Sequence, residues 1–118
     1  MSPKILVVED EFLIRLTLTE ALADQGFAIS EAADSQEALD RLAQDRFALV
    51  VTDVQLPGPI NGLQVGRAAL EADPMVQVIY VSGRPDAAAQ SGPRERFIGK
   101  PYLPSQLCAL AKRMTTPG

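Results

Sequence analysis

The sequence of 118 residues contains no histidine, no tryptophan and a single cysteine, Cys108. Without histidine the chain cannot form a histidine-based catalytic triad, and a zinc site built from histidine and several cysteines is excluded as well. One cysteine cannot form an intramolecular disulfide and fits a reducing compartment. Any metal ion must therefore be bound by oxygen ligands.

Long apolar segments and dense positive charge are also missing. No run approaches the roughly 18 residues that a membrane-spanning helix needs, and the start of the chain has no signal-peptide pattern. We therefore expect a cytoplasmic protein that does not enter the membrane. The net charge is −4 and lysine and arginine form no stripe, which argues against binding to nucleic acid.

The composition is that of a globular protein. Hydrophobic residues make up 47% of the chain, and nine prolines and eight glycines are spread along it. A chain of this length buries about two thirds of its unfolded surface, and it has no room for a second core. We expect residues 1–118 to form one domain.

The most informative stretch is residues 47–62, FALVVTDVQLPGPING. Residues 47–52 are apolar or β-branched and run straight into Asp53, which predicts a strand buried on both faces. The carboxyl ends of strands in open α/β sheets border the ligand-binding crevice, so Asp53 is placed for chemistry. A loop rich in proline and glycine follows, and Asn61 is a good N-cap for the next helix.

Strand and helix patterns alternate along the whole chain. We expect strands at residues 4–8, 27–32, 47–52, 76–81 and 96–99. We expect helices at residues 12–25, 34–45, 63–72 and 104–114. Only residues 86–90 are left for a helix between the last two strands, so the fourth helix should be shortened or irregular. Five such units predict a doubly wound, five-stranded parallel α/β sheet with helices on both faces.

Polar residues follow the expected strands where each strand ends. They are Glu9, Asp10, Glu11, Asp53, Ser82 and Lys100. Because parallel strands end at one rim of the sheet, these acids, the hydroxyl and the lysine should converge there. Packing alone would not produce this combination.

These residues carry a resemblance to a known family. The chain resembles the receiver domain of two-component response regulators in VVEDE at residues 7–11, in DVQLPG from Asp53, in the Ser82–Gly83 pair and in Lys100–Pro101. The resemblance covers the whole chain and implies a flavodoxin-like fold with strand order 2-1-3-4-5. The loop after Asp53 is one residue longer than usual, as in single-domain regulators that accompany α-proteobacterial sensor kinases.

The resemblance implies a phosphoacceptor with a bound Mg²⁺. Asp53 would take a phosphoryl group as an acyl phosphate. Glu9 and Asp10 would hold Mg²⁺ together with Asp53 and the backbone carbonyl of Gln55. The donor would be a histidine kinase or a histidine phosphotransfer protein, while the output partner is not indicated.

Further roles are implied for residues around the phosphoryl group. Lys100 would pair with one phosphoryl oxygen, and Ser82 would donate a hydrogen bond to another. Pro101 would follow a cis peptide bond. Ser82 and Phe97 would act as the switch, with Phe97 buried even before phosphorylation because it lacks a polar tip. Arg84 would shield the acyl phosphate and lengthen its lifetime.

The first helix offers a docking face for the phosphodonor. If Ile14, Leu18 and Ala21 form its core stripe, Phe12 and Leu16 lie on the opposite side and are exposed. We expect these two apolar side chains to contact the helical bundle of the donor.

Two other classes of protein fit these residues less well. A dehalogenase-like phosphohydrolase also uses an aspartyl phosphate, but it carries a DxD motif, whereas residue 55 is glutamine and no cap domain is present. An interaction module with an inactive site is disfavoured by the complete set of polar residues. Glu11 is better explained as an acid at a helix N-terminus, and Tyr102 and Cys108 as packing residues.

Overall fold

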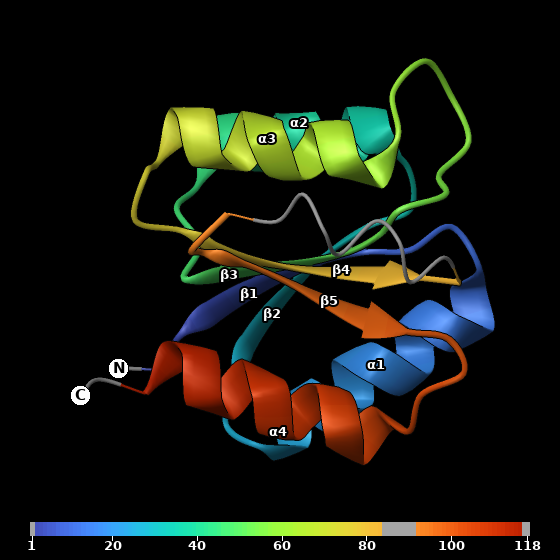
Figure 1. Cartoon of the computed structure of the whole chain (residues 1–118), viewed down its shortest axis with the longest axis vertical. Coiled ribbons are helices and arrows are strands. Elements are labelled where there is room, and N and C mark those ends of the chain that lie inside the picture. The colour runs from blue at the N-terminus through green and yellow to red at the C-terminus, as the bar shows by residue number, and fades with distance from the viewer. Residues whose placement is uncertain (1, 84–91, 117–118) are drawn as a thin grey trace.

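The computed structural model of the chain describes residues 2–83 and 92–116 (Figure 1). Five parallel strands form one sheet in the order β2-β1-β3-β4-β5, which confirms the predicted topology. The elements are β1 (Lys4–Val8), α1 (Phe12–Asp24), β2 (Ala28–Ala32), α2 (Ser35–Gln44), β3 (Leu49–Asp53), α3 (Gly62–Ala72), β4 (Gln77–Ser82), β5 (Glu95–Gly99) and α4 (Pro104–Thr115).

Helices cover both faces of the sheet. Helices α1 and α4 lie on one face, and α2 and α3 lie on the other (Figure 1). Side chains of β1 alternate between the two layers: Ile5 and Val7 pack in the cluster with α1 and α4, and Leu6 and Val8 pack in the cluster with α2 and α3. A strand covered on both faces needs an uninterrupted apolar sequence, which explains the runs seen in β1 and β3.

The start of α3 is fixed by the cap that the sequence predicts. The Asn61 side chain accepts a hydrogen bond from the Gln64 backbone N–H at 3.0 Å, and the Gln64 side chain accepts one from the Asn61 N–H at 2.8 Å. This reciprocal pair satisfies two N–H groups that the helix itself leaves free. It also places the first turn of α3 beside the end of β3.

One residue of the core stripe expected for α1 is not buried. Leu18 is buried and Ala21 is partly buried, but Ile14 is 37% exposed, and the buried stripe continues through Leu22 instead. The prediction for Ile14 was wrong because Ile14, although it lies on the same side of α1 as Leu18, lines an open groove between the start of α1 and residues 101–104 and is not covered there.

Two features expected from the sequence lie outside the described residues. They are Arg84 and the short helix at residues 86–90. None of the helices in the described ranges has the combination of length and apolar character needed to cross a membrane.

Candidate functional site

The polar residues predicted at the strand ends are brought together by the register of the sheet. Asp53 ends β3 and pairs with Val81 of β4, and the backbone N–H of Lys100 donates to the carbonyl of Ser82 at 2.9 Å. Three neighbouring strands therefore deliver a carboxylate, a hydroxyl and an ammonium group to one rim. Asp53 and Ser82 are both buried, at 8% and 7% exposure.

Both oxygens of the Asp53 carboxylate are held in place. Oδ1 accepts a hydrogen bond from the backbone N–H of Gln55 at 2.9 Å, and Oδ2 accepts one from the Lys100 ammonium at 2.7 Å. A charge-assisted bond of this length is among the stronger kinds in proteins. The carboxylate thus has a defined orientation at the end of β3.

Lys100 combines a fixed backbone with a partly exposed side chain. Its side chain is 41% exposed, and the Lys100–Pro101 peptide bond is cis, as the resemblance implied. Burial lowers the pKa of Lys100, but the hydrogen bond from its ammonium to Asp53 and the charges of Asp53 and Glu9 outweigh burial, so the pKa is raised overall. Lys100 is therefore a permanent cation at neutral pH.

Three acids form a cluster next to this ion pair. Carboxylate oxygens of Glu9, Asp10 and Asp53 lie within 4.8 Å of one another. Glu9 is only 4% exposed, and its Oε2 has no hydrogen-bond partner among the residues that the structure describes. Burial and then the neighbouring Asp53 carboxylate raise the pKa of Glu9 to about 8. Glu11 is the exposed N-cap residue of α1 and lies outside the cluster.

An unpartnered, buried carboxylate oxygen within a group of acids fits a hard divalent cation. Mg²⁺ binds through a small number of carboxylates and keeps several waters, and Asp10 on the exposed side of the cluster leaves room for them. A cation would also satisfy the Glu9 oxygen and offset the repulsion among the three acids. The donor set therefore matches the expected ion.

Comparison with known proteins identifies the family. The family model for the response regulator receiver domain matches residues 5–112. The chain belongs to this family. A receiver domain is a signalling module of two-component systems, and the acidic cluster, Asp53 and Lys100 lie at its strand ends.

Curated relatives include proteins of different length. The chain is 32% identical over 117 residues to the C4-dicarboxylate transport transcriptional regulatory protein DctD of Rhizobium meliloti, covering 95% of the chain but 25% of DctD. It is 29% identical over 106 residues to the response regulator receiver protein CpdR of Brucella abortus, covering 84% of the chain and 85% of CpdR. The receiver domain thus spans about a quarter of one relative and most of the other.

Solved structures share the fold over nearly the full chain. A response regulator receiver protein from Sinorhizobium medicae has a TM-score of 0.89 at 26% identity, covering 97% of this chain and 94% of that one. The response regulator TrrA from Thermotoga maritima, solved in complex with Mg²⁺–BeF, has a TM-score of 0.83 at 27% identity, covering 97% and 99%.

A close backbone contact behind Asp53 was not predicted from the sequence. A Cβ atom placed on Gly62, the first residue of α3, would lie 1.8 Å from the carbonyl oxygen of Asp53 and 2.7 Å from its carbonyl carbon. The Gly62 N–H donates to the carbonyl of Val54 at 2.8 Å. Glycine therefore lets α3 start directly against the backbone of the candidate phosphoacceptor, and no spacing in the sequence signals this contact.

Phe97 on β5 lies against a buried polar pair. Its ring centroid is 4.8 Å from that of Tyr80 on β4, and Phe97 is partly buried. The Tyr80 hydroxyl donates to the Glu95 carboxylate, which is only 3% exposed and also accepts the Gly92 N–H at 3.0 Å. Burial, followed by the bond to Glu95, raises the pKa of Tyr80. Tyr80, against which Phe97 packs, is thus held in place by its hydrogen bond to Glu95, a contact that was not predicted from the sequence.

An apolar groove of about 600 Å³ opens beside the acids of this receiver domain. Leu13, Ile14 and Thr17 of α1 form one wall, and the loop that begins at Pro101 forms the other. Tyr102 lines this groove and packs against the core, as expected, and burial followed by the charges of Glu9 and Asp53 raises its pKa to about 12.

The raised pKa of Glu9 predicts how the stability of the metal-free protein depends on pH. Above its ordinary pKa of 4.5, Glu9 is ionised in the unfolded chain but stays protonated in the folded protein up to about pH 8. The folded state binds the extra proton, so the free energy of unfolding should fall by roughly 2 kcal/mol from about pH 6 to pH 8. The chain has no histidine, so no imidazole titrates in this range.

Thermal unfolding in EDTA across this pH range measures the effect. Glu9→Gln, which cannot ionise, should lose most of the slope. A wild-type protein whose stability is constant or rises over the same range would contradict the assignment.

Proposed function

We propose that this receiver domain accepts a phosphoryl group on Asp53, in a Mg²⁺-dependent reaction, from a histidine kinase or a histidine phosphotransfer protein. The observation that carries the proposal is the geometry at Asp53. Its buried carboxylate is fixed by Gln55 and Lys100, and it belongs to the cluster with Glu9 and Asp10. An aspartate held in this way is a suitable covalent nucleophile.

The proposed transfer is an in-line displacement at phosphorus. An oxygen of the Asp53 carboxylate forms the new P–O bond while the P–N bond to the donor imidazole breaks, and the imidazole nitrogen keeps the electron pair and takes up a proton. Lys100 pairs with an oxygen of the incoming phosphoryl group, and its partly exposed side chain can follow that oxygen. Asp53 and Lys100 would thus orient the phosphoryl group and stabilise its negative charge, which are the main requirements of phosphoryl transfer.

The residues that would hold Mg²⁺ are Glu9, Asp10, Asp53 and the backbone carbonyl of Gln55. When bound, Mg²⁺ supplies positive charge that offsets the negative charge of the carboxylates and of the phosphoryl oxygens. The unpartnered Oε2 of Glu9 supports this assignment. The complex of TrrA with Mg²⁺–BeF supports it further by similarity of fold.

Signalling would follow from a conformational change at the neighbouring strand ends. The Ser82 hydroxyl would donate to a phosphoryl oxygen, and Phe97 would fill the space on the sheet beside it. The contact of Phe97 with Tyr80 supports a mainly inward position of Phe97 before phosphorylation. Arg84, outside the described residues, is proposed to slow hydrolysis of the acyl phosphate. Loss of the phosphoryl group would be a self-catalysed reaction of the same site.

Phosphorylation by a small-molecule donor tests the central proposal. The protein is incubated with acetyl phosphate, and its intact mass is measured with Mg²⁺ and with EDTA. The proposal requires the mass to rise by one phosphoryl group with Mg²⁺ and to stay unchanged with EDTA. Labelling of equal extent in EDTA would contradict the role of the acidic cluster.

The exposed apolar side chains of α1 are proposed to dock the phosphodonor. Phe12 is 62% exposed and Leu16 is 39% exposed, and both lie on the helix that follows the acidic cluster. Leu16→Asp should slow phosphoryl transfer from the cognate kinase by about tenfold or more, because a charge is introduced into an apolar contact. Labelling by acetyl phosphate, which needs no docking, should continue at the wild-type rate.

Met75→Asp provides the control for this prediction. Met75 is also a large exposed apolar residue, at 69%, but it lies between α3 and β4 and away from the acidic cluster. Transfer from the kinase to this variant should match that to wild type. Equal slowing of Leu16→Asp with both donors would indicate damage to the fold and would remove Leu16 from the docking face.

A further inference from the structure

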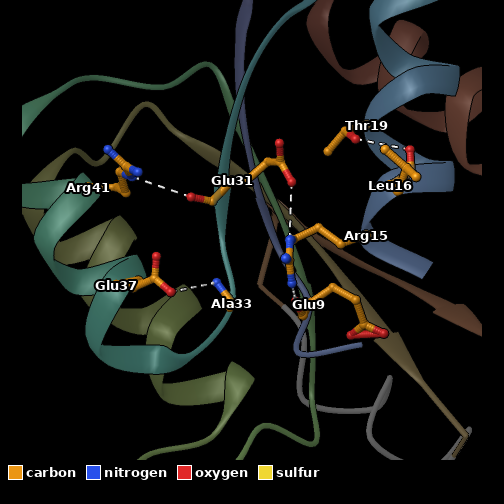
Figure 2. A network of polar contacts seen from close by, with 8 residues as sticks. All are labelled: Glu9, Arg15, Leu16, Thr19, Glu31, Ala33, Glu37 and Arg41. Carbon is orange, nitrogen blue, oxygen red and sulfur yellow. Dashed lines mark hydrogen bonds and ion pairs between the residues drawn. The ribbon is translucent and has the colours of Figure 1, made fainter. Parts of the chain in front are cut away.

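Arg15 of α1 forms hydrogen bonds both to Glu9, which follows β1, and to Glu31 of β2, the strand at one edge of the sheet (Figure 2). Its Nη1 donates to the backbone carbonyl of Glu9 at 2.7 Å, and its Nε donates to the Glu31 carboxylate at 3.1 Å. The Arg15 side chain is only 14% exposed, although it lies on a helix whose neighbouring residues face solvent. The guanidinium therefore has a defined position between α1 and β2.

The carbonyl that Arg15 binds belongs to the peptide between Glu9 and Asp10, two of the three acids of the cluster. β1 ends at Val8, so Glu9 and Asp10 lie in the loop that follows this strand. The Glu9 N–H donates to the carbonyl of Ala32 at 3.0 Å, and the Glu9 carbonyl accepts from Arg15. The backbone of Glu9 is thus held by two hydrogen bonds, one from its N–H to β2 and one to its carbonyl from Arg15.

The guanidinium is itself held from several directions. The Glu31 carboxylate binds its Nε, and its central carbon lies 5.6 Å from the centre of the Phe12 ring. The backbone carbonyl of Glu31 in turn accepts from Arg41 of α2 at 3.3 Å (Figure 2). A planar guanidinium can bind two acceptors in a fixed geometry, which an ammonium group cannot reproduce.

We propose that Arg15 is a positioning residue for the divalent-cation site, acting through the peptide between Glu9 and Asp10. This inference rests on the proposed Mg²⁺ site and adds a residue that does not itself contact the ion. Mg²⁺ demands near-octahedral ligand geometry. If the backbone between Glu9 and Asp10 were free to move, ordering it on binding would cost free energy and weaken the affinity for the ion. Arg15 removes that cost by holding the peptide in place beforehand.

The binding affinity for Mn²⁺ tests the proposal without any phosphoryl transfer. Free Mn²⁺ is measured by electron paramagnetic resonance in titrations of wild type, Arg15→Met and Arg15→Lys, and thermal unfolding in EDTA shows that each variant is folded. Arg15→Met should bind Mn²⁺ about 10- to 100-fold more weakly, as is usual when a residue supporting metal ligands is lost. Arg15→Lys should fall between wild type and Arg15→Met, because it keeps the charge but replaces the two nitrogens that bind Glu9 and Glu31 by one.

Arg41→Met is the matched control. It also removes a guanidinium that binds Glu31, but Arg41 does not contact Glu9, so Mn²⁺ affinity should stay within about twofold of wild type. Equal affinity of Arg15→Met and wild type, or equal losses in Arg15→Met and Arg41→Met, would overturn the proposal. If Arg15→Met does not fold, Arg15→Lys decides: binding weakened by about threefold or more supports the proposal, and unchanged binding overturns it.

Different results would contradict the proposed function and the proposed role of Arg15. A wild-type protein that does not bind Mn²⁺ would contradict the proposed function. Wild-type binding together with unchanged binding by the Arg15 variants would contradict only the role of Arg15.

Discussion

Asp53→Asn should abolish phosphorylation by acetyl phosphate in the presence of Mg²⁺, with no gain of mass where wild type gains one phosphoryl group. An amide oxygen does not form an acyl phosphate, so the loss should be complete. Asparagine has nearly the same shape and can still accept the hydrogen bond from the Gln55 N–H. The variant should therefore fold, and the loss can be assigned to the missing carboxylate.

Asp34→Asn is the matched control for this substitution. Asp34 caps α2 by accepting a hydrogen bond from the Glu37 N–H at 2.8 Å, and asparagine is an equally good N-cap. This variant should be labelled like wild type. Labelling of Asp53→Asn to the wild-type level would show that another residue accepts the phosphoryl group.

Gly62→Ala should destabilise the protein strongly and disturb the site. Alanine is favoured over glycine by about 1 kcal/mol in a helix interior, so at the first position of α3 intrinsic propensity alone predicts no loss of stability. The new Cβ would, however, lie 1.8 Å from the carbonyl oxygen of Asp53, which is a backbone atom, and the Cβ itself is attached rigidly to the backbone of α3. Neither can move without shifting α3 or the end of β3, so we expect a loss of about 3 kcal/mol or more.

Two measurements separate these effects on Gly62→Ala. Urea unfolding gives the loss of stability, and labelling by acetyl phosphate below the unfolding transition should be slowed by about tenfold or more, because the displaced backbone carries Asp53. Gly99→Ala is the control, since its Cβ would meet the Ser82 carbonyl at an ordinary 3.9 Å. Its stability should stay within about 1 kcal/mol of wild type. Wild-type stability of Gly62→Ala would show that the contact relaxes easily.

The sequence by itself determined the sheet and the rim on which the acids gather. Five apolar runs separated by helical patterns predict a parallel sheet with helices on its faces, and parallel strands have all their carboxyl ends at one edge of the sheet. That Asp53, Ser82 and Lys100 share one rim follows from this arrangement, and the structure agrees. The family resemblance added the strand order, which the observed sheet confirms.

The tertiary structure decided which contacts hold the residues of this rim in place. Ile14 is left uncovered beside an open groove, and Arg15 reaches the Glu9 carbonyl, and neither outcome can be read from the spacing of apolar residues along α1. The approach of Gly62 to Asp53 depends on the distance between α3 and β3. Such contacts depend on how whole elements are placed against each other, and local periodicity carries no information about that placement.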